Sequence, residues 1–387
     1  MALFHGSPLM MRKLLLAVSL VLASLGFVPP AQAIDSNAKQ ALLIDYRTGT
    51  VLMEKNADEL MPPSSMSKMM TIYMVFQRLK EGSLSLDDTL AVSEKAWRMG
   101  GSKMFVKVGD RVRVEDLLRG IIVQSGNDAC IVVAEGLAAS EASFADEMTR
   151  RGKEIGLKNT IFRNSTGWPD PEHLTTARDL AWLALRTIRD FPEFYRYYGE
   201  TQFTYSGISQ PNRNLLLGKN MGVDGLKTGH TEAAGYGITI SGQRDNRRLV
   251  LVVNGLSSMK ERAEEAERLL DWGFREFENV AMFNAGDMVT EIPVWLGQQA
   301  MVPAHIRQTM EITIPRKARR GLKVAAQFNA PAPAPIRKGT VLGKLIVTAP
   351  DMPPLELPLE AGADVERLGF MGRLSAAVKY ILWGPNG

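Results

Sequence analysis

The sequence predicts a mixed α/β (α+β) domain, in which an antiparallel sheet packs with helices, followed by a small all-β domain. Strand-like and helix-like apolar periodicities alternate from about residue 41 to residue 276, and two of the strand pairs are typical hairpins. Beyond Asn284 only short β-rich runs remain, separated by Pro and Gly. A chain of 387 residues with 45% hydrophobic residues is long enough for two folded units with a sizeable core.

The first domain is expected over residues 34–283, with one predicted hairpin near its start and a second near its end. The predicted strands are Ala41–Asp45 with Val51–Lys55, and Gly235–Gly242 with Leu249–Val253 around an Asp-Asn turn at 245–246. The predicted helices are Met66–Glu81, Val114–Val123, Ala129–Ala138, a helix running to Arg189 and Met259–Glu276. The first of these helices is apolar nearly all round, which is typical of a buried helix, and Gly82 is a natural stop. Thr176 and Asp179 predict a capping box.

The second domain is expected over residues 284–363. Its predicted strands are Met288–Val294, Met310–Ile314, Leu322–Phe328, Val341–Val347 and Leu355–Leu359. The alternating Ala and Pro of Ala330–Pro335 indicate a stiff connection between two strands.

The last segment, residues 364–387, has a different character. Apolar side chains from Leu368 to Leu382 fall on one face of a helix, with cationic residues off that face and Trp383 at its end. This pattern predicts a helix that lies in the plane of a membrane surface. An amphipathic helix packed on the β domain is the alternative.

Residues 1–33 predict a secretory signal peptide. Arg12 and Lys13 precede an apolar run from Leu14 to Val28, and Ala31-Gln32-Ala33 is a cleavage site. A retained N-terminal anchor is the alternative. We therefore expect an exported protein that begins near Ile34.

Composition argues against several classes of function. The net charge of +4 is mild and no dense basic run occurs, so a nucleic-acid partner is not expected. One cysteine, Cys130, allows no internal disulfide and is more typical of a buried helix residue than of a reactive thiol. The four histidines show no metal-ligand spacing, so neither a metal nor a cofactor is expected.

Three short motifs carry candidate chemistry. In Ser65-x-x-Lys68 the lysine lies one helical turn from the hydroxyl and, if buried, can act as its base. The same pattern occurs at Ser36/Lys39 and Ser257/Lys260, but only Ser65 opens a buried helix. Alone, this motif is more typical of a serine helix N-cap with an incidental lysine.

The second motif, Ser125-Gly126-Asn127, places a hydroxyl and an amide on one turn, where they can relay a proton and hold a substrate amide. The third, Lys227-Thr228-Gly229, offers a cation and a hydroxyl to a carboxylate, and its glycine admits a substrate backbone. Alone, the second is an ordinary turn with an Asn127/Asp128 helix cap, and the third is a lysine-bearing turn. Together and in this order, they match the S-x-x-K, S-D-N and K-T-G set of class A β-lactamases and penicillin-binding proteins, except that S-G-N stands in the S-D-N position.

The chain resembles the low-molecular-mass penicillin-binding proteins, specifically the serine-type D-alanyl-D-alanine carboxypeptidases. The resemblance extends to residues 116–120, 124–129 and 223–231, and covers about residues 34–278 strongly and the β domain more loosely. It implies a β-lactamase/transpeptidase-like catalytic domain. It also implies a hydrolase acting on peptidoglycan stem peptides that end in D-Ala-D-Ala, acylated by β-lactam antibiotics. The expected location is the periplasmic face of the inner membrane.

The resemblance also implies roles for individual residues. Ser65 is the expected nucleophile, Lys68 its base and Ser125 the proton relay, while Asn127 holds Lys68 and the substrate amide. The remaining expected groups bind substrate: Lys227, Thr228 and Gly229, the backbone N–H of His230 in an oxyanion hole with that of Ser65, and the arginines Arg213 and Arg262. Either arginine is alternatively an ordinary surface residue.

Three other functions remain open from the motifs. A D,D-endopeptidase uses the same catalytic set. A class A β-lactamase needs a deacylating glutamate in an E-x-x-L-N segment, for which Glu172 is the nearest candidate and lacks the asparagine. A non-catalytic envelope protein would keep the fold without turnover.

Overall fold

The computed structural model describes residues 34–383. The expected signal peptide at residues 1–33 and the last residues, 384–387, lie outside this range.

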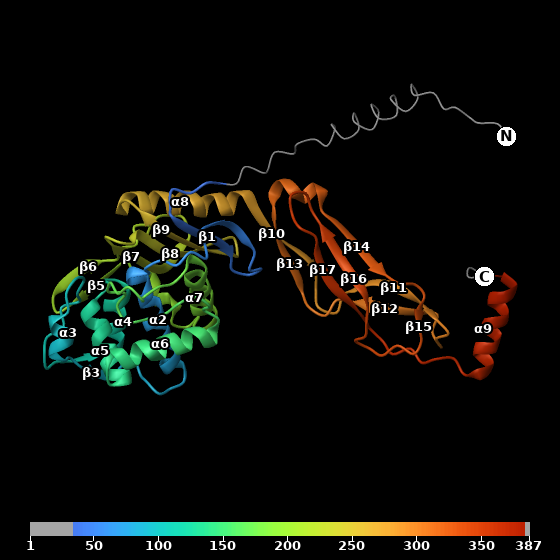
Figure 1. Cartoon of the computed structure of the whole chain (residues 1–387), viewed down its shortest axis with the longest axis horizontal. Coiled ribbons are helices and arrows are strands. Elements are labelled where there is room, and N and C mark those ends of the chain that lie inside the picture. Colours follow the sequence, from blue (N-terminus) through green and yellow to red (C-terminus); the bar gives the residue numbers. More distant parts are fainter. Residues whose placement is uncertain (1–33, 384–387) are drawn as a thin grey trace, which may run out of the picture. The chain divides into compact units, whose positions relative to one another are not determined.

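A five-stranded antiparallel sheet forms the centre of the first domain (Figure 1). Its strands, in spatial order, are β2 (Val51–Lys55), β1 (Gln40–Asp45), β9 (Arg247–Leu256), β8 (Gly235–Arg244) and β7 (Val223–Thr231). Strand β7, which carries the Lys-Thr-Gly motif, is therefore an edge strand. Helix α8 (Met259–Glu276) covers one face, while α7 (Ala177–Asp190) and the remaining helices lie on the other.

The helical part surrounds α2 (Lys68–Lys80), which follows a 3₁₀ turn, η1 (Ser64–Ser67). Every residue of α2 from Lys68 to Phe76 is buried, which confirms the buried helix that its apolar pattern predicts. Its neighbours are α4 (Val114–Ile122), α5 (Asn127–Ala138) and α6 (Glu141–Ile155), with the short α3 (Glu94–Arg98) beside α5. Two small ribbons, β3 (Thr89–Ala91) with β4 (Arg111–Arg113) and β5 (Gln202–Tyr205) with β6 (Ile208–Pro211), and a 3₁₀ turn, η2 (Tyr195–Gly199), complete the domain.

Both predicted hairpins are confirmed. Asp245 and Asn246 adopt φ of 47° and 63°, as both central residues of a type I′ hairpin turn do. The capping box is only half correct. The Thr176 hydroxyl accepts from the Asp179 backbone N–H at 3.0 Å, but the Asp179 carboxylate binds residues 158–160 instead of returning to Thr176. The Asp179 carboxylate thereby ties the start of α7 to the loop at residues 158–160.

The C-terminal region is almost entirely β. Strand β10 (Phe277–Phe283) continues directly from α8 and pairs with β13 (Met310–Pro315), which leads into the 3₁₀ turn η3 (Arg316–Gly321). The six-stranded sheet contains, in order, β14 (Lys323–Phe328), β16 (Val341–Thr348), β17 (Leu355–Ala361), β12 (Met301–His305), β11 (Met288–Trp295) and β15 (Ala332–Pro333). The sequence pattern missed β12. The Ala-Pro stretch supplies β15, which pairs in parallel with β11. The domain boundary near residue 284 stays a prediction.

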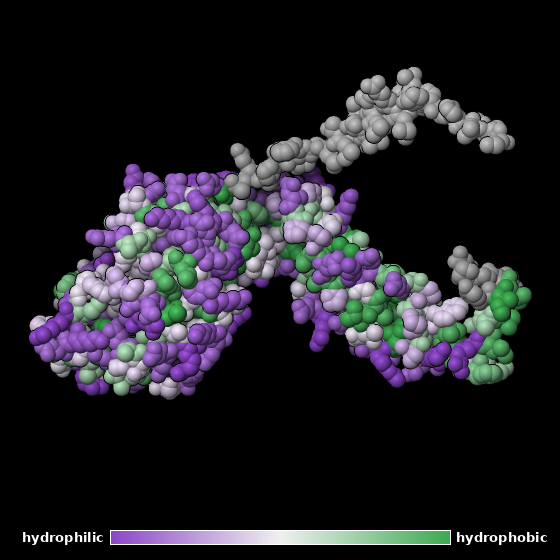
Figure 2. Space-filling view, in the orientation of Figure 1, coloured by the Kyte–Doolittle hydropathy of each residue, from purple (hydrophilic) through white to green (hydrophobic). Residues whose placement is uncertain are grey.

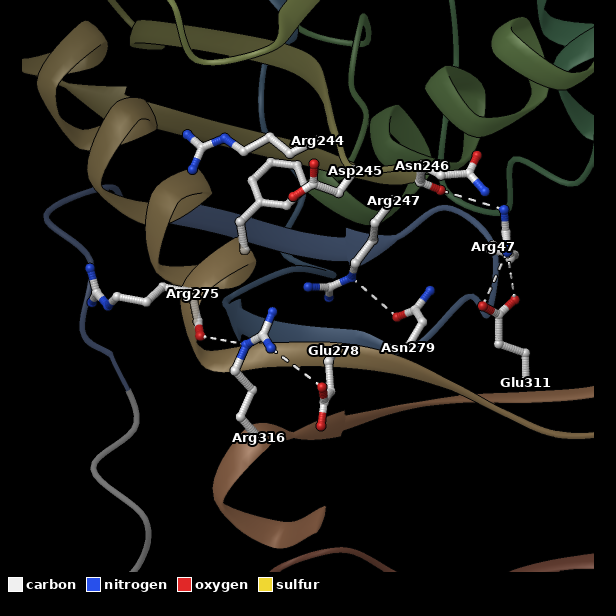
Figure 3. Close-up of a pocket in the computed structure, with 11 residues that line it drawn as sticks. Arg47, Arg244, Asp245, Asn246, Arg247, Arg275, Glu278, Asn279, Glu311 and Arg316 are labelled. Carbon is white, nitrogen blue, oxygen red and sulfur yellow. Dashed lines mark hydrogen bonds and ion pairs between the residues drawn. The ribbon is translucent and has the colours of Figure 1, made fainter.

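Polar groups converge where α8 passes into β10 (Figure 3). Around a cavity of about 420 Å³, Arg47 binds Glu311, and Arg316 binds Glu278 and the Arg275 carbonyl. Arg247 donates to the buried Asp45 at 2.9 Å and to Asn279 at 3.1 Å. These guanidinium groups already bind side chains and carbonyl groups of the protein itself. The cavity is therefore part of the structural framework and not a candidate substrate site.

Helix α9 (Phe370–Trp383) begins six residues later than the expected segment and presents apolar side chains to solvent. Figure 2 shows hydrophobic surface over it. Exposed members include Phe370, Met371, Leu374 and Ile381, of which Ile381 is 80% exposed. Within residues 34–383 no helix combines the length and apolar character that crossing a bilayer requires.

Candidate active site

The candidate nucleophile, Ser65, lies in the η1 turn directly before α2. Ser64, which precedes it, adopts a φ of 50°, a strained conformation for a residue with a side chain. Lys68 Nζ donates to Ser65 Oγ at 2.8 Å and to the Thr166 carbonyl at 2.6 Å. The lysine nitrogen is thus held between the hydroxyl it would deprotonate and a fixed carbonyl.

Lys68 is 0% exposed, and this burial governs its chemistry. Burial disfavours the ammonium form and lowers the pKa of Lys68 to about 8, with a further lowering from the Arg213 charge. An amine with a pKa near the working pH has a substantial neutral fraction. It can therefore accept a proton from Ser65.

The loop that carries Thr166 was not recognised from the sequence. Asn164 Oδ1 accepts from the backbone N–H groups of Thr166, Gly167 and Trp168 and from the Thr166 hydroxyl. Buried His173 closes the loop against η1, with Nε2 2.8 Å from Ser67 Oγ. Burial lowers the pKa of His173 to about 4, so this ring is neutral at ordinary pH. The Asn-x-x-Gly spacing, an Asx-type turn, was the available signal.

The Ser125-Gly126-Asn127 turn packs beside the loop at residues 100–102. Ser125 is buried and has a φ of 60°, a second strained residue of the site. Asn127 donates from its backbone to Ser102 and from Nδ2 to the Gly100 carbonyl at 2.9 Å. In residues 34–383 no hydrogen bond joins the Ser125 hydroxyl to Lys68. The relay role of Ser125, like the role of Asn127, therefore stays a prediction.

Gly126, not Asp128, is the N-cap residue of α5, although Asp128 Oδ1 accepts from the Ala129 backbone N–H in the first turn of the helix at 2.9 Å. The Asp128 carboxylate also accepts from the backbone N–H groups of Met104, Phe105 and Val106. It thereby ties the start of α5 to the adjoining loop and helps to fix the Ser-Gly-Asn turn.

Strand β7 approaches the nucleophile turn at Gly229. A Cβ atom placed on Gly229 would lie 3.0 Å from the Pro63 carbonyl oxygen and 3.1 Å from Met66 Cγ. Only glycine allows the strand and the turn to come this close without displacement. Two residues farther along the strand, Thr231 Oγ1 lies 3.2 Å from Ser64 Oγ.

Lys227 and Thr228 are both buried on β7, and a cluster of cations surrounds them. Burial, and then the charges of Lys68, Arg213 and Arg262, hold the pKa of Lys227 well below its usual range. Across the described residues no carboxylate forms an ion pair with any of these four cations. Such a cluster favours a bound anion.

The two candidate arginines differ in exposure. Arg262 is 3% exposed, which excludes the surface alternative, and burial lowers its pKa to about 10. Its Nη2 donates to the Arg213 carbonyl at 3.1 Å, while its buried Nε has no partner. Arg213 remains exposed, yet its charge acts on Lys68, Lys227 and Arg262. His230 stacks on Tyr236, with ring centroids 3.9 Å apart.

The competing motif copies have structural partners. Ser36 Oγ donates to Glu265, and Ser257 Oγ binds Glu261. Glu172, the candidate deacylating glutamate, pairs with Arg163, and its side chain is 69% exposed. Cys130 is fully buried, and burial raises the pKa of its thiol to about 12.

Comparison with family models decides the family. The model described as D-alanyl-D-alanine carboxypeptidase matches residues 28–258, and the model described as the penicillin-binding protein 5 C-terminal domain matches residues 277–367. The chain belongs to the D-alanyl-D-alanine carboxypeptidase family. It is therefore a serine-type hydrolase of this family, as the motifs indicated, and the predicted fold class is confirmed.

Similar proteins cover from 63% to 89% of this family member. D-alanyl-D-alanine carboxypeptidase DacC of Escherichia coli is 40% identical over 351 residues, which cover 89% of this chain and 88% of the relative. The solved penicillin-binding protein 5 of Haemophilus influenzae is 36% identical with a TM-score of 0.78, and covers 87% of this chain and 100% of its own. Penicillin-binding protein D2 of Listeria monocytogenes, solved in an ampicillin-bound form, is 28% identical with a TM-score of 0.58 and covers 63% of this chain and 100% of its own.

Proposed function

We propose that this carboxypeptidase removes the terminal D-alanine from peptidoglycan stem peptides that end in D-Ala-D-Ala, through an acyl-enzyme on Ser65. The observation that carries the proposal is the buried Lys68 amine, with a pKa of about 8, 2.8 Å from Ser65 Oγ. A nucleophilic hydroxyl needs such a base. The expected specificity for a free C-terminus follows from the neighbouring cations.

In the proposed acylation, Ser65 Oγ attacks the carbonyl carbon of the penultimate D-alanine and transfers its proton to Lys68. The terminal carboxylate binds at Lys227 and Thr228, with Arg262 and Arg213 supplying further positive charge. The backbone N–H groups of Ser65 and His230 donate to the oxyanion, each worth roughly 3 kcal/mol in such sites.

Collapse of the tetrahedral intermediate breaks the C–N bond. The departing D-alanine amine takes a proton, which Ser125 relays from Lys68, while Asn127 holds the substrate amide. Water then attacks the acyl-enzyme and restores Ser65. A β-lactam, which carries a carboxylate and a reactive amide, would acylate the same serine, and the ampicillin-bound relative supports this.

The test uses the chain without residues 1–33 and a Ser65→Ala control. D-Alanine release from a pentapeptide ending in D-Ala-D-Ala, together with covalent labelling by a fluorescent penicillin, is expected of the first protein only. Absence of both signals from the unaltered protein would mean an inert envelope scaffold.

Two other activities are separated by substrate. Hydrolysis of a chromogenic cephalosporin at a rate that exceeds D-alanine release would indicate a β-lactamase, which the exposed Glu172 does not support. Cleavage of a cross-linked muropeptide dimer would indicate a D,D-endopeptidase.

We also propose that the enzyme works at the periplasmic face of the inner membrane, attached peripherally by α9. The exposed apolar side chains of α9, among them Phe370 and Ile381, support an in-plane position in the membrane surface. Deleting residues 364–387 should free the protein from sedimented membranes while penicillin labelling continues. If the truncated protein still sediments with membranes, α9 is not the anchor.

A further inference from the structure

A largely apolar groove lies beside the candidate nucleophile. Its volume is about 270 Å³, and its apolar wall consists of Pro62, Pro63, Trp168, Pro169 and Pro171. Asp170 is the one carboxylate among its lining residues. We call this the Trp168 groove.

The groove continues directly from the catalytic site. Ser64 and Thr231 line it as well, and their hydroxyl oxygens lie 3.2 Å apart. Ser64 is the immediate neighbour of the nucleophile in the chain. Gly167, also in the lining, packs so tightly on the nucleophile turn that a Cβ there would lie 3.1 Å from the Ser65 backbone nitrogen.

The direction of β7 indicates which part of a substrate reaches the groove. With the proposed function as the starting point, the terminal carboxylate binds at Thr228 and the scissile carbonyl lies at Ser65. Thr231 is three residues beyond Thr228, roughly 10 Å along the strand. The peptide on the acyl side therefore leaves past Gly229 toward the Trp168 groove. The residue just before D-Ala-D-Ala is the first whose side chain can enter.

Trp168 is held as a rigid platform in this groove. Its backbone N–H donates to Asn164 Oδ1 and to Thr166 Oγ1, both at 3.0 Å, and its carbonyl accepts from Asn164 Nδ2. The ring packs on Gly101, where an added Cβ would lie 3.1 Å from it. The side chain nevertheless stays 47% exposed. A fixed, half-exposed indole offers contact area to an aliphatic chain at little entropic cost.

Asp170 supplies the polar end. Its Oδ1 accepts from the Glu172 backbone N–H at 2.8 Å, and no cation forms an ion pair with its carboxylate within residues 34–383. An unpaired carboxylate at an apolar groove is complementary to an aliphatic chain that ends in an amine.

We propose that the Trp168 groove binds the side chain of the residue that precedes D-Ala-D-Ala. Trp168 packs on its aliphatic part and Asp170 pairs with a terminal amine. The two residues thereby make the enzyme prefer a diamino acid at this position. Neither touches the reacting atoms, so both act on specificity.

The experiment compares kcat/KM for three synthetic peptides that differ only before D-Ala-D-Ala: Nα-acetyl-lysine, the same residue acetylated also on Nε, and Nα-acetyl-alanine. The unaltered enzyme is expected to prefer the free-amine lysine peptide over its Nε-acetyl form by about fivefold, the size of one partly exposed ion pair. Asp170→Asn keeps an acceptor for the Glu172 N–H and should bring that ratio close to one.

Trp168→Ala is expected to lower kcat/KM for both lysine peptides about tenfold and for the alanine peptide less than threefold. For the lysine peptides, kcat/KM of Trp168→Leu should lie between that of the unaltered enzyme and that of Trp168→Ala. Trp97→Ala, which removes an indole of 44% exposure from α3, is the matched control and should change none of the ratios.

Acylation by 6-aminopenicillanic acid separates this inference from a general loss of function, because its bare amine leaves the groove empty. Its rate should stay within twofold in both groove variants. Ratios that do not respond to Trp168→Ala or Asp170→Asn, in an enzyme that releases D-alanine, overturn the groove assignment alone. An unaltered enzyme that releases no D-alanine overturns the proposed function and this inference with it.

Discussion

Replacing Lys68 by Met should separate the catalytic value of this lysine from its cost to the folded protein. The amine is fully buried, and its pKa falls from 10.5 to about 8. Methionine has a similar length, is apolar and does not titrate. We expect Lys68→Met to lose acylation by penicillin about 10³-fold, because Ser65 then has no base.

The difference in unfolding free energy between the unaltered enzyme and Lys68→Met should depend on pH, and the lowered pKa of Lys68 fixes the direction. Below pH 8 the lysine is charged in both states, and the folded protein carries the full burial cost of roughly 3 kcal/mol. Between pH 8 and 10.5 the folded protein has lost the proton while the unfolded chain still holds it, so unfolding becomes harder as pH rises. The unaltered enzyme should therefore gain about 2.5 kcal/mol relative to Lys68→Met between pH 7 and pH 10.

Urea unfolding of both proteins at pH 7, 8, 9 and 10 measures this quantity. The hydrogen bonds from Lys68 to Ser65 and Thr166 are missing from the variant at every pH, so to first order their loss adds a constant. Groups that do not interact with Lys68 cancel in the difference, whereas Lys227, whose pKa the Lys68 charge helps to lower, adds a contribution of its own. A difference in unfolding free energy that stays flat across this range would refute a buried lysine with a pKa near 8.

The acylation rate of the unaltered enzyme should rise about tenfold per pH unit below pH 8 and level off above it, because only neutral Lys68 accepts the proton. Stopped-flow labelling from pH 5.5 to 9.5 measures this rate. A rate that is already flat at pH 6 would contradict the prediction. Gly229→Ala should lower acylation at least tenfold, since the added Cβ meets the Pro63 carbonyl oxygen at 3.0 Å and pushes β7 from the nucleophile turn. Gly369→Ala, with no atom within 4 Å of its added Cβ, is the control. Arg247→Ala should destabilise the protein by roughly 3–5 kcal/mol in thermal unfolding, because Asp45 stays buried without its ion-pair partner, and a loss under 1 kcal/mol would contradict this.

The sequence pattern predicted several elements that local rules govern, although it missed α6, which has a Ser140 N-cap and a Gly156 C-cap. Helix α8 begins and ends at the predicted residues, because its apolar periodicity and flanking turn are both local. The hairpin turn at Asp245-Asn246 was equally predictable, since two adjacent residues that tolerate positive φ favour a type I′ turn. Strand β12 was missed because Pro303 and His305 interrupt the strand pattern, and pairing with β11 and β17 overrides it.

The candidate site was predictable in its identities but not in its supports. Three motifs indicated Ser65, Ser125 and Lys227. No local pattern shows that the Thr166 carbonyl, 98 residues from Lys68, accepts from that amine. The same holds for the contact between His173 and Ser67, which joins two segments far apart in sequence. Such partners depend on tertiary packing, which a single sequence does not reveal.

Several features of the candidate site cost the folded protein stability. Ser64 and Ser125 hold strained backbones, and Lys68 and Lys227 are desolvated without a carboxylate partner. A substrate carboxylate at Lys227 would supply the missing opposite charge and raise the pKa of that lysine, so that a cation forms where the substrate binds. Lys68 instead keeps its neutral neighbours, Ser65 and the Thr166 carbonyl. One buried lysine is thus set to bind charge and the other to take a proton, and the difference lies in which of them meets the substrate carboxylate.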